Sequence, residues 1–143
     1  GLGGNAGFLI ERGLRVIGVD VSELGVRHAK ARWPSLMGAV IDLAHYRWPP
    51  CSFDVILNFY YCQRDLWPLY RFMLKPGGVL IMETLTIETL RTRPDYNPDF
   101  LLQPDELRQA FAGWEVLVYR EGWLGKGNLS PRAVASLVAR RPV

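Results

Sequence analysis

Blocks of apolar residues, separated by glycine, proline and polar residues, predict helices and strands that alternate along most of the chain. A glycine-rich opening leads into a helix over 5–12, and Gly13 stands where a left-handed C-terminal cap is expected. An apolar strand over 15–19 follows and is closed by Asp20. The chain therefore opens on a glycine turn, a helix and a strand that ends in an acid.

The next blocks continue this alternation. Ser22 is placed to cap a helix over 23–32, which ends at Trp33–Pro34 because a proline disfavours helical geometry in the residue before it. Two apolar strands are predicted over 36–41 and 53–58. The second is almost wholly apolar, so we expect it to be buried on both faces of a sheet.

Apolar residues at helical spacing predict an amphipathic helix after these strands. Its apolar positions follow the i, i+3, i+4, i+7, i+8 pattern: Leu66, Leu69, Tyr70, Met73 and Leu74. Asp65 can cap this helix, and Pro68 lies in its first turn, where proline is tolerated. Residues 75–78, Lys-Pro-Gly-Gly, are predicted to turn the chain into a strand over 79–84.

A long polar stretch over 85–102 separates that strand from the last helix. Loops of this length in a compact domain are usually functional or disordered. Pro104 then opens a helix that ends at Gly113, because proline is favoured at the first helical position. The apolar face of this helix consists of Leu107, Ala110 and Phe111.

Two terminal strands, over 114–120 and 132–140, flank a glycine-rich loop over 121–131. Such a pair often closes an α/β sheet with an antiparallel edge. The complete order predicts a Rossmann-like α/β fold with a doubly wound, mostly parallel sheet and an antiparallel terminal strand. In such folds the ligand crevice lies outside the carboxyl ends of the strands.

Length and composition favour one domain over residues 1–143, because 49% hydrophobic residues can supply a core. The sequence has no run of about 18 apolar residues and no basic-then-apolar leader, so we expect a cytoplasmic protein without a membrane partner. Cys51 and Cys62 are expected to be free thiols. The net charge of +3 is a mild positive bias and gives only weak evidence that the protein binds nucleic acid.

Glycine or polar residues stand where ligands bind in such a sheet. Gly1 and Gly3 lack a Cβ, so backbone can approach a ligand closely at the start of the first helix. Asp20 is placed to accept hydrogen bonds from two ribose hydroxyls, although an acid near a helix start can also act as a cap. Asp42 and Asn58 follow the next two strands, and an acid there can also simply start a turn.

Four motifs carry a resemblance to a known family. Gly1–Ala6 resembles the latter part of a Cys-Gly-Leu-Gly-Arg-Asn-Ala loop, and Asp20–Ser22 resembles the Asp-x-Ser after the second strand. Phe53–Ile56 resembles the fourth strand, and Leu74–Gly78 the turn before the fifth. Over essentially its whole length the chain resembles class I S-adenosylmethionine-dependent methyltransferases, most closely the small bacterial tellurite-resistance-type branch.

This resemblance implies S-adenosylmethionine as cofactor and direct transfer of its methyl group to a small molecule. Gly1 and Gly3 would let the methionine part lie against backbone, and Asp20 would bind both ribose hydroxyls. Asp42 would accept a hydrogen bond from the adenine amino group. Val21 and Leu43 would pack against the two faces of the adenine ring. Asn58 and Tyr60 would border the methyl-transfer pocket.

Two departures from the family pattern stand near the N-terminus. The family's first strand, with an acid that helps to hold the methionine amino group, would precede Gly1, so we expect an N-terminally truncated chain. Gly4 stands where relatives often carry arginine, which removes an arginine contact to an anionic substrate.

The residues show no catalytic constellation or metal-ligand spacing, and His28 and His45 are isolated, so no catalytic residue and no metal is assigned. A sulfonium methyl is already activated and chiefly requires an aligned nucleophile.

Two alternatives stay open: a nicotinamide-dependent oxidoreductase, which shares the glycines and the later acid, and a non-catalytic cofactor-binding domain. Because 58–61 read Asn-Phe-Tyr-Tyr instead of Asn/Asp-Pro-Pro-aromatic, a nucleic-acid acceptor is not favoured. Acceptor choice would reside in loops 85–102 and 121–131.

Overall fold

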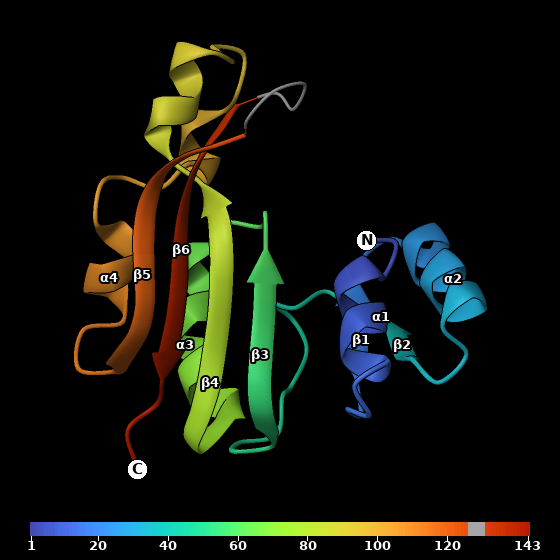
Figure 1. Cartoon of the computed structure of the whole chain (residues 1–143). Coiled ribbons are helices and arrows are strands. Elements are labelled where there is room, and N and C mark those ends of the chain that lie inside the picture. The colour runs from blue at the N-terminus through green and yellow to red at the C-terminus, as the bar shows by residue number, and fades with distance from the viewer. Residues whose placement is uncertain (126–130) are drawn as a thin grey trace. The chain divides into compact units, whose positions relative to one another are not determined.

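The computed structural model describes residues 1–125 and 131–143, which form two compact units (Figure 1). The N-terminal unit comprises residues 1–47 and the C-terminal unit residues 48–143. The N-terminal unit contains α1 (Gly4–Ile10), β1 (Ile17–Asp20), α2 (Glu23–Arg32) and β2 (Met37–Val40). The C-terminal unit contains β3 (Phe53–Phe59), the 3₁₀ helix η1 (Arg64–Leu66), α3 (Trp67–Met73), β4 (Leu74–Leu85), the 3₁₀ helices η2 (Ile87–Arg91) and η3 (Pro98–Phe100), α4 (Glu106–Ala110), β5 (Glu115–Leu124) and β6 (Arg132–Arg140).

The N-terminal unit is a short βαβ arrangement preceded by α1. Strands β1 and β2 pair in parallel, with Ile17 opposite Met37 and Asp20 opposite Val40. Helix α2 connects them and begins as the sequence predicts, because the Ser22 hydroxyl oxygen accepts a hydrogen bond of 3.1 Å from the Gly25 amide. The parallel pairing brings the carboxyl ends of both strands to the same edge of this small sheet.

The C-terminal unit is a four-stranded mixed sheet in the order β3-β4-β6-β5. Strands β3 and β4 are parallel, β6 is antiparallel to β4, and β5 is antiparallel to β6. The two terminal strands therefore pair with each other, and β6 lies between β4 and β5 (Figure 1). This arrangement confirms the predicted antiparallel terminal strand. Residues 126–130 of the predicted loop lie outside the described residues.

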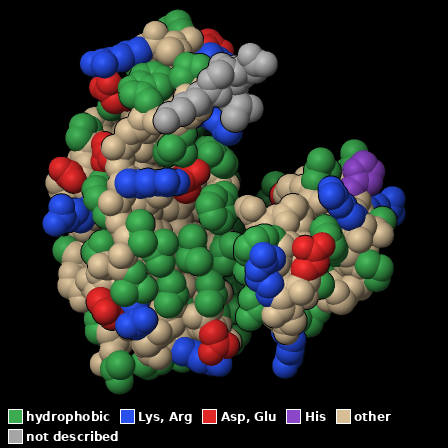
Figure 2. Space-filling view, viewed as in Figure 1, with side chains coloured by type: hydrophobic (Ala, Val, Ile, Leu, Met, Phe, Trp, Pro, Cys, Tyr) green, Lys and Arg blue, Asp and Glu red, His purple; other side chains and the backbone are tan. Residues whose placement is uncertain are grey.

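The two faces of this sheet differ in burial. The side chains of Leu80, Met82 and Leu137 are at most 1% exposed on the face where α3 and α4 pack. Because side chains alternate along a strand, the neighbouring positions of β4 point to the opposite side, here called the open face. One register row of this open face contains Leu57, Ile81, Val138 and Val118. Figure 2 shows hydrophobic side chains gathered on it.

Several predictions for the C-terminal unit are wrong in detail. The strand at 53–58 is not buried on both faces, because β3 is an edge strand whose Val55 is 40% exposed. Asp65 does not cap α3, because the chain already turns into η1 at Arg64 and Leu66 occupies the N-cap position. The predicted turn at 75–78 lies within β4, where Gly77 has a φ of 76°.

Other sequence expectations are confirmed. Gly13 has the left-handed backbone expected of it, with a φ of 79°. The last helix, by contrast, is shorter than predicted, because α4 begins at Glu106 and ends at Ala110, before Gly113. Cys51 and Cys62 are free thiols. Among the described residues, none of the helices combines the length and apolar character that crossing a bilayer requires.

Candidate functional site

The opening turn of the N-terminal unit requires glycine at Gly3. Gly3 has a φ of 75°, a left-handed backbone conformation that residues other than glycine rarely adopt. A Cβ at this position would lie 2.8 Å from the Cβ of Ala29 on α2. At Gly1, by contrast, a Cβ would meet nothing within 4 Å. The sequence analysis explained both glycines by the close approach of a ligand. At Gly3, the structure shows that glycine is required by the backbone conformation and by the packing against α2.

Asp20 presents an ionised carboxylate at the carboxyl end of β1. Its Oδ1 accepts a hydrogen bond of 2.9 Å from the Ser22 amide, and its Oδ2 accepts one from the amino group of Gly1. The hydrogen bond from that amino group, followed by the bond from Ser22, lowers the pKa of the Asp20 carboxyl. Asp20 thus supports the turn into α2 while Ser22 itself provides the cap. The structure therefore places Gly1 beside Asp20.

Asp42 lies just beyond β2 at the same edge, since the Ile41 amide donates to the Asp20 carbonyl oxygen over 3.0 Å. Its carboxylate accepts from the Ala44 amide at 3.0 Å and lies 2.8 Å from His45 Nδ1. The contact with His45, and then that with Ala44, lowers the pKa of Asp42. The sequence analysis did not identify this Asp–His pair. The spacing of three residues between Asp42 and His45, directly after a strand, is a pattern that could have indicated it.

The two residues expected to sandwich an adenine ring differ in exposure. Val21 directly follows Asp20 and is 70% exposed. Leu43 follows Asp42 and is half-buried. The N-terminal unit therefore offers apolar side chains next to both carboxylates.

Asn58 lies within the C-terminal unit and is only 7% exposed. Its side-chain amide donates to the Tyr70 hydroxyl over 2.7 Å, while its Oδ1 has no hydrogen-bond partner among the described residues. Burial raises the pKa of Tyr70 to about 12, so this hydroxyl stays protonated at neutral pH. Asn58 pairs with Met82 in the register, which places its side chain on the helix-packed face. A role of Asn58 beside the cofactor remains a prediction.

Tyr60 follows β3 and has an unusual backbone. Its φ of 55° is left-handed, and its amide donates to the Glu83 carbonyl oxygen over 2.7 Å. Its phenol donates to Glu83 Oε1 over 3.0 Å, and the Arg132 guanidinium lies 5.3 Å from its ring centre. Burial, and then the hydrogen bond to Glu83, raises the pKa of Tyr60. The neighbouring Tyr61 instead donates to Gln63 Oε1.

Glu83, near the carboxyl end of β4, is the centre of a polar cluster that the sequence did not reveal. Its Oε2 accepts from the Ser136 hydroxyl at 2.5 Å and from Arg120 at 3.4 Å, in addition to the bond from Tyr60. Burial alone would raise the pKa of Glu83, but the hydrogen bonds from Ser136, Tyr60 and Arg120 outweigh it and lower the pKa. With 13% of its side chain exposed, Glu83 is a half-buried, ionised carboxylate.

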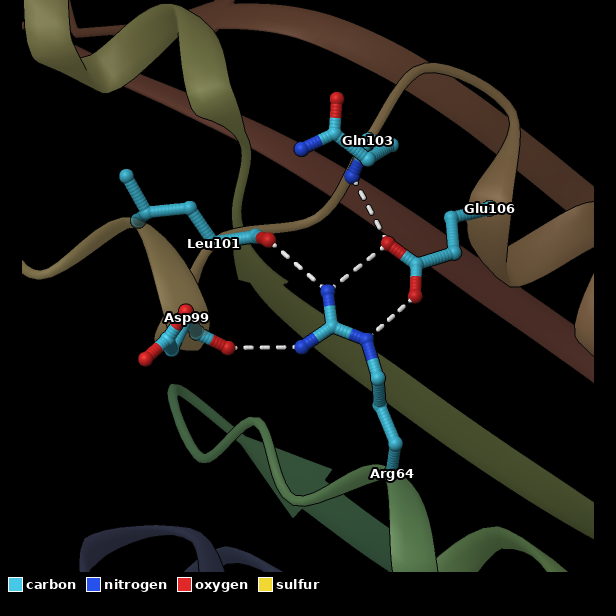
Figure 3. Close-up of polar contacts among 5 residues, drawn as sticks. All are labelled: Arg64, Asp99, Leu101, Gln103 and Glu106. Atoms are coloured by element: carbon cyan, nitrogen blue, oxygen red, sulfur yellow. Dashed lines mark hydrogen bonds and ion pairs between the residues drawn. The ribbon is translucent and has the colours of Figure 1, made fainter.

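The polar stretch at 85–102, predicted as a loop, is ordered by one arginine (Figure 3). Arg64 forms a bidentate pair with Glu106, through Nε at 2.5 Å and Nη2 at 2.9 Å. Its remaining donors reach the carbonyl oxygens of Asp99 and Leu101. A bridge between Thr86 and Leu102 closes the base of the segment. In residues 1–125 and 131–143, no group of His, Cys, Asp and Glu side chains could hold a metal ion.

Comparison with known proteins gives a consistent picture of the fold. No family model matches the chain. A protein of Mycolicibacterium smegmatis, named as a probable S-adenosylmethionine-dependent methyltransferase, is 34% identical over 90 residues, which cover 59% of this chain and 35% of that protein. The chain thus spans about a third of the length of this curated relative.

Two solved structures illustrate the likeness in three dimensions. An S-adenosylmethionine-dependent methyltransferase of Methanosarcina mazei has a TM-score of 0.82 at 14% identity, covering 100% of this chain and 89% of that one. TehB of Haemophilus influenzae has a TM-score of 0.79 at 20% identity, covering 99% of this chain and 55% of that one. The chain has the Rossmann-like α/β fold of the class I S-adenosylmethionine-dependent methyltransferases.

Proposed function

We propose that this chain is an S-adenosylmethionine-dependent methyltransferase that methylates a small molecule. The observation that carries the proposal is the arrangement at one edge of the N-terminal sheet. There, two carboxylates, Asp20 and Asp42, follow adjacent parallel strands, and Asp20 lies beside the glycine turn before α1. The names of the similar proteins, including the Mycolicibacterium smegmatis relative, support the same activity.

The residues of this edge fit an adenosine. At Gly1 a Cβ would meet nothing within 4 Å, so the backbone there is open and a ligand can lie against it. The ionised Asp20 can accept from both ribose hydroxyls, and Asp42 can accept from the adenine amino group. Val21 and Leu43 would supply apolar contacts to the ring faces. When bound, S-adenosylmethionine supplies an activated methyl group, so the protein needs to bind and orient the acceptor instead of activating it with a strong base.

A small-molecule acceptor is supported by the residues after β3. The sequence there is Asn-Phe-Tyr-Tyr at 58–61, without the Pro-Pro-aromatic pattern that nucleic-acid amino-methylating enzymes usually carry. The fold shared with TehB is compatible with the small bacterial branch proposed from the motifs.

Calorimetric titration of the full chain with S-adenosylhomocysteine, and with NADH in parallel, tests this function. We expect S-adenosylhomocysteine to bind and NADH not to bind. Asp20→Asn should weaken binding tenfold or more, about 1.4 kcal/mol, because the acceptor for the ribose hydroxyls is lost. Asp54→Asn is the matched control, since Asp54 is an exposed acid paired with Lys75 at 2.8 Å. Binding of NADH alone, or an unchanged affinity in folded Asp20→Asn, would contradict the proposal.

A further inference from the structure

Strand β5 has one edge without a partner strand. It is the last strand in the sheet order β3-β4-β6-β5, and it pairs with β6 on one side only (Figure 1). In the described part of the chain, no backbone–backbone hydrogen bond joins residues 115–124 to a segment other than β6. The outward N–H and C=O groups of this strand are therefore available to pair with another strand.

The open edge of β5 is apolar and carries few of the features that usually protect such an edge. Val116, Leu117 and Val118 are consecutive and each at least 40% exposed. Proteins commonly protect an edge with lysine, with proline or by keeping the strand short. Residues 115–124 contain neither lysine nor proline. The strand has 10 residues, whereas about five or six are most common. These properties indicate an edge that another strand covers.

A bulge near the start of β5 determines which of its side chains share a face. Val116 stands opposite Ala139 of β6, and Val118 stands opposite Val138, so Leu117 is the extra residue. On either side of the bulge, one residue belongs to each face of the sheet. The open face has Glu115 and Arg120, and the helix-packed face has Val116 and Tyr119.

Two copies of β5 match one another in one antiparallel register. When Glu115 stands opposite Arg120 of a second copy, Val116 stands opposite Tyr119 and Leu117 opposite Val118. Directly opposed side chains share a face in such a pair, and opposite charges or aromatic and β-branched side chains there are stabilising. The side chains of Glu115 and Arg120 are 59% and 61% exposed, so both can contact a second copy in addition to their own chain.

The helix-packed side of this edge is hollowed beside the start of β5. Trp114 and Val116 line the hollow together with residues of α4 and the turn that follows it, among them Arg108 and Gly113. In the register above, Tyr119 of the second copy stands opposite Val116, at the margin of this hollow. An aromatic ring placed there adds apolar contact to the strand pairing.

The other edge of the sheet does not offer this match. Strand β3 has seven residues, and its one charged side chain is Asp54. Because β3 contains no cation, no register between two copies of β3 brings opposite charges together. The charge pattern therefore distinguishes β5 from β3 as a self-pairing strand.

We propose that the protein forms a two-fold symmetric dimer in which β5 pairs with β5 of a second copy. The two four-stranded sheets then form one continuous sheet across the dimer. Because both copies use the same strand, the contact is self-complementary and closes after two copies. The interface belongs to the C-terminal unit alone and is independent of the proposed methyltransferase function.

Sedimentation velocity of the full chain, from micromolar to near-millimolar concentration, tests this dimer. We expect Val118→Lys to raise the dissociation constant at least tenfold, about 1.4 kcal/mol, because it places a cation against Leu117 of the second copy. Val55→Lys is the matched control, since Val55 is an exposed valine on the open face of the other edge strand. It should leave the dissociation constant unchanged. A wild type that stays monomeric, or a dimer that Val55→Lys weakens as much as Val118→Lys, overturns the inference.

A charge reversal tests the register. Glu115→Lys places a cation opposite Arg120 of the second copy, so we expect it to weaken the dimer about tenfold. Asp54→Lys is the matched control, because Asp54 is also an exposed acid in a surface ion pair of 2.8 Å. Equal effects of the two reversals overturn the register with Glu115 opposite Arg120.

Hydrogen exchange of the wild type tests the same interface without any substitution. As the protein concentration rises, we expect amide exchange in β5 to slow while exchange in β3 stays constant, because only the outward amides of β5 gain partners. Exchange in β5 that does not depend on concentration overturns the dimer. Slowing confined to β3 overturns it as well and assigns the contact to the other edge.

Discussion

The two units of this protein differ in how much apolar side chain they bury. In the N-terminal unit, the apolar residues that are more than nine-tenths buried are Val26, Ala29 and Leu36. The described part of the C-terminal unit buries a much larger set, which extends from Cys62 through Phe111 to Ala139. Because a chain of about 50 residues buries too little surface to be more than marginally stable, the N-terminal unit is expected to be the weaker of the two.

The candidate ligand contacts lie in the unit with the smaller core. The candidate adenosine contacts, including Asp20 and Asp42, belong to the unit with the small core. There the glycine turn and the strand ends are fixed by a few close contacts, such as those of Gly3 with α2. The polar cluster of the C-terminal unit is instead held by long-range hydrogen bonds to Glu83. A small change in packing should therefore cost more function in the N-terminal unit.

The largest effect is expected from Gly7→Ala in the N-terminal unit. A Cβ at Gly7 would lie 2.1 Å from the Trp33 ring, so the ring must leave its place against α1. We expect a loss of about 3 kcal/mol, because overpacking a small core has few ways to relax. Hydrogen exchange should then show lost protection in residues 1–47 and preserved protection in residues 48–143. Equal loss of protection in both units would contradict the difference between them.

Gly4→Ala provides the matched control for this change. Gly4 lies in the same helix α1, and a Cβ there meets nothing within 4 Å. Alanine favours a helix over glycine by roughly 1 kcal/mol, so this variant should keep or increase the protection of α1. A loss of protection in Gly4→Ala would show that α1 tolerates no change and that Gly7→Ala does not report on the Trp33 contact.

A smaller effect is expected from Arg64→Ala in the C-terminal unit. Arg64 joins η1 to the segment at 85–102 through Glu106 and two carbonyl oxygens. Its removal leaves a partly buried carboxylate without its partner, so we expect a loss of about 2 kcal/mol. Urea unfolding measures this change, and Arg91→Ala, which removes an exposed pair with Glu88, should cost only a few tenths of a kcal/mol. Equal effects of the two variants would show that the Arg64 contacts do not stabilise the unit.

Local patterns predicted the elements that local contacts determine. Ser22 caps α2 and Gly13 is left-handed, because both features depend on residues within one turn of the chain. The parallel placement of Asp20 and Asp42 followed from the alternation of strands and helices.

Features that depend on distant residues could not be predicted in this way. The partners of Glu83 are 23 and 53 residues away along the chain, so no local pattern indicates the cluster. The same separation hides the bond from Arg64 to Glu106, 42 residues apart. The exposure of β3 was also missed, because an apolar run does not show whether its strand lies at the edge of a sheet.

The smallest expected effect is the pH dependence that the Arg64–Glu106 pair contributes. The hydrogen bond from Arg64 lowers the pKa of Glu106 below its ordinary value of 4.5. A carboxyl with a depressed pKa stabilises the folded state above its unfolded pKa, and this stabilisation is lost as the pH falls through the folded pKa. The stability advantage of wild type over Glu106→Gln should therefore shrink as the pH falls from about 6 to about 3 in urea unfolding experiments. Glu88→Gln, which removes an exposed acid from the neighbouring η2, controls for the general effect of losing a negative charge. A stability advantage that stays constant over this range would show that Arg64 does not stabilise the ionised form of Glu106. The bridge between Thr86 and Leu102 would then be the contact that orders the segment at 85–102.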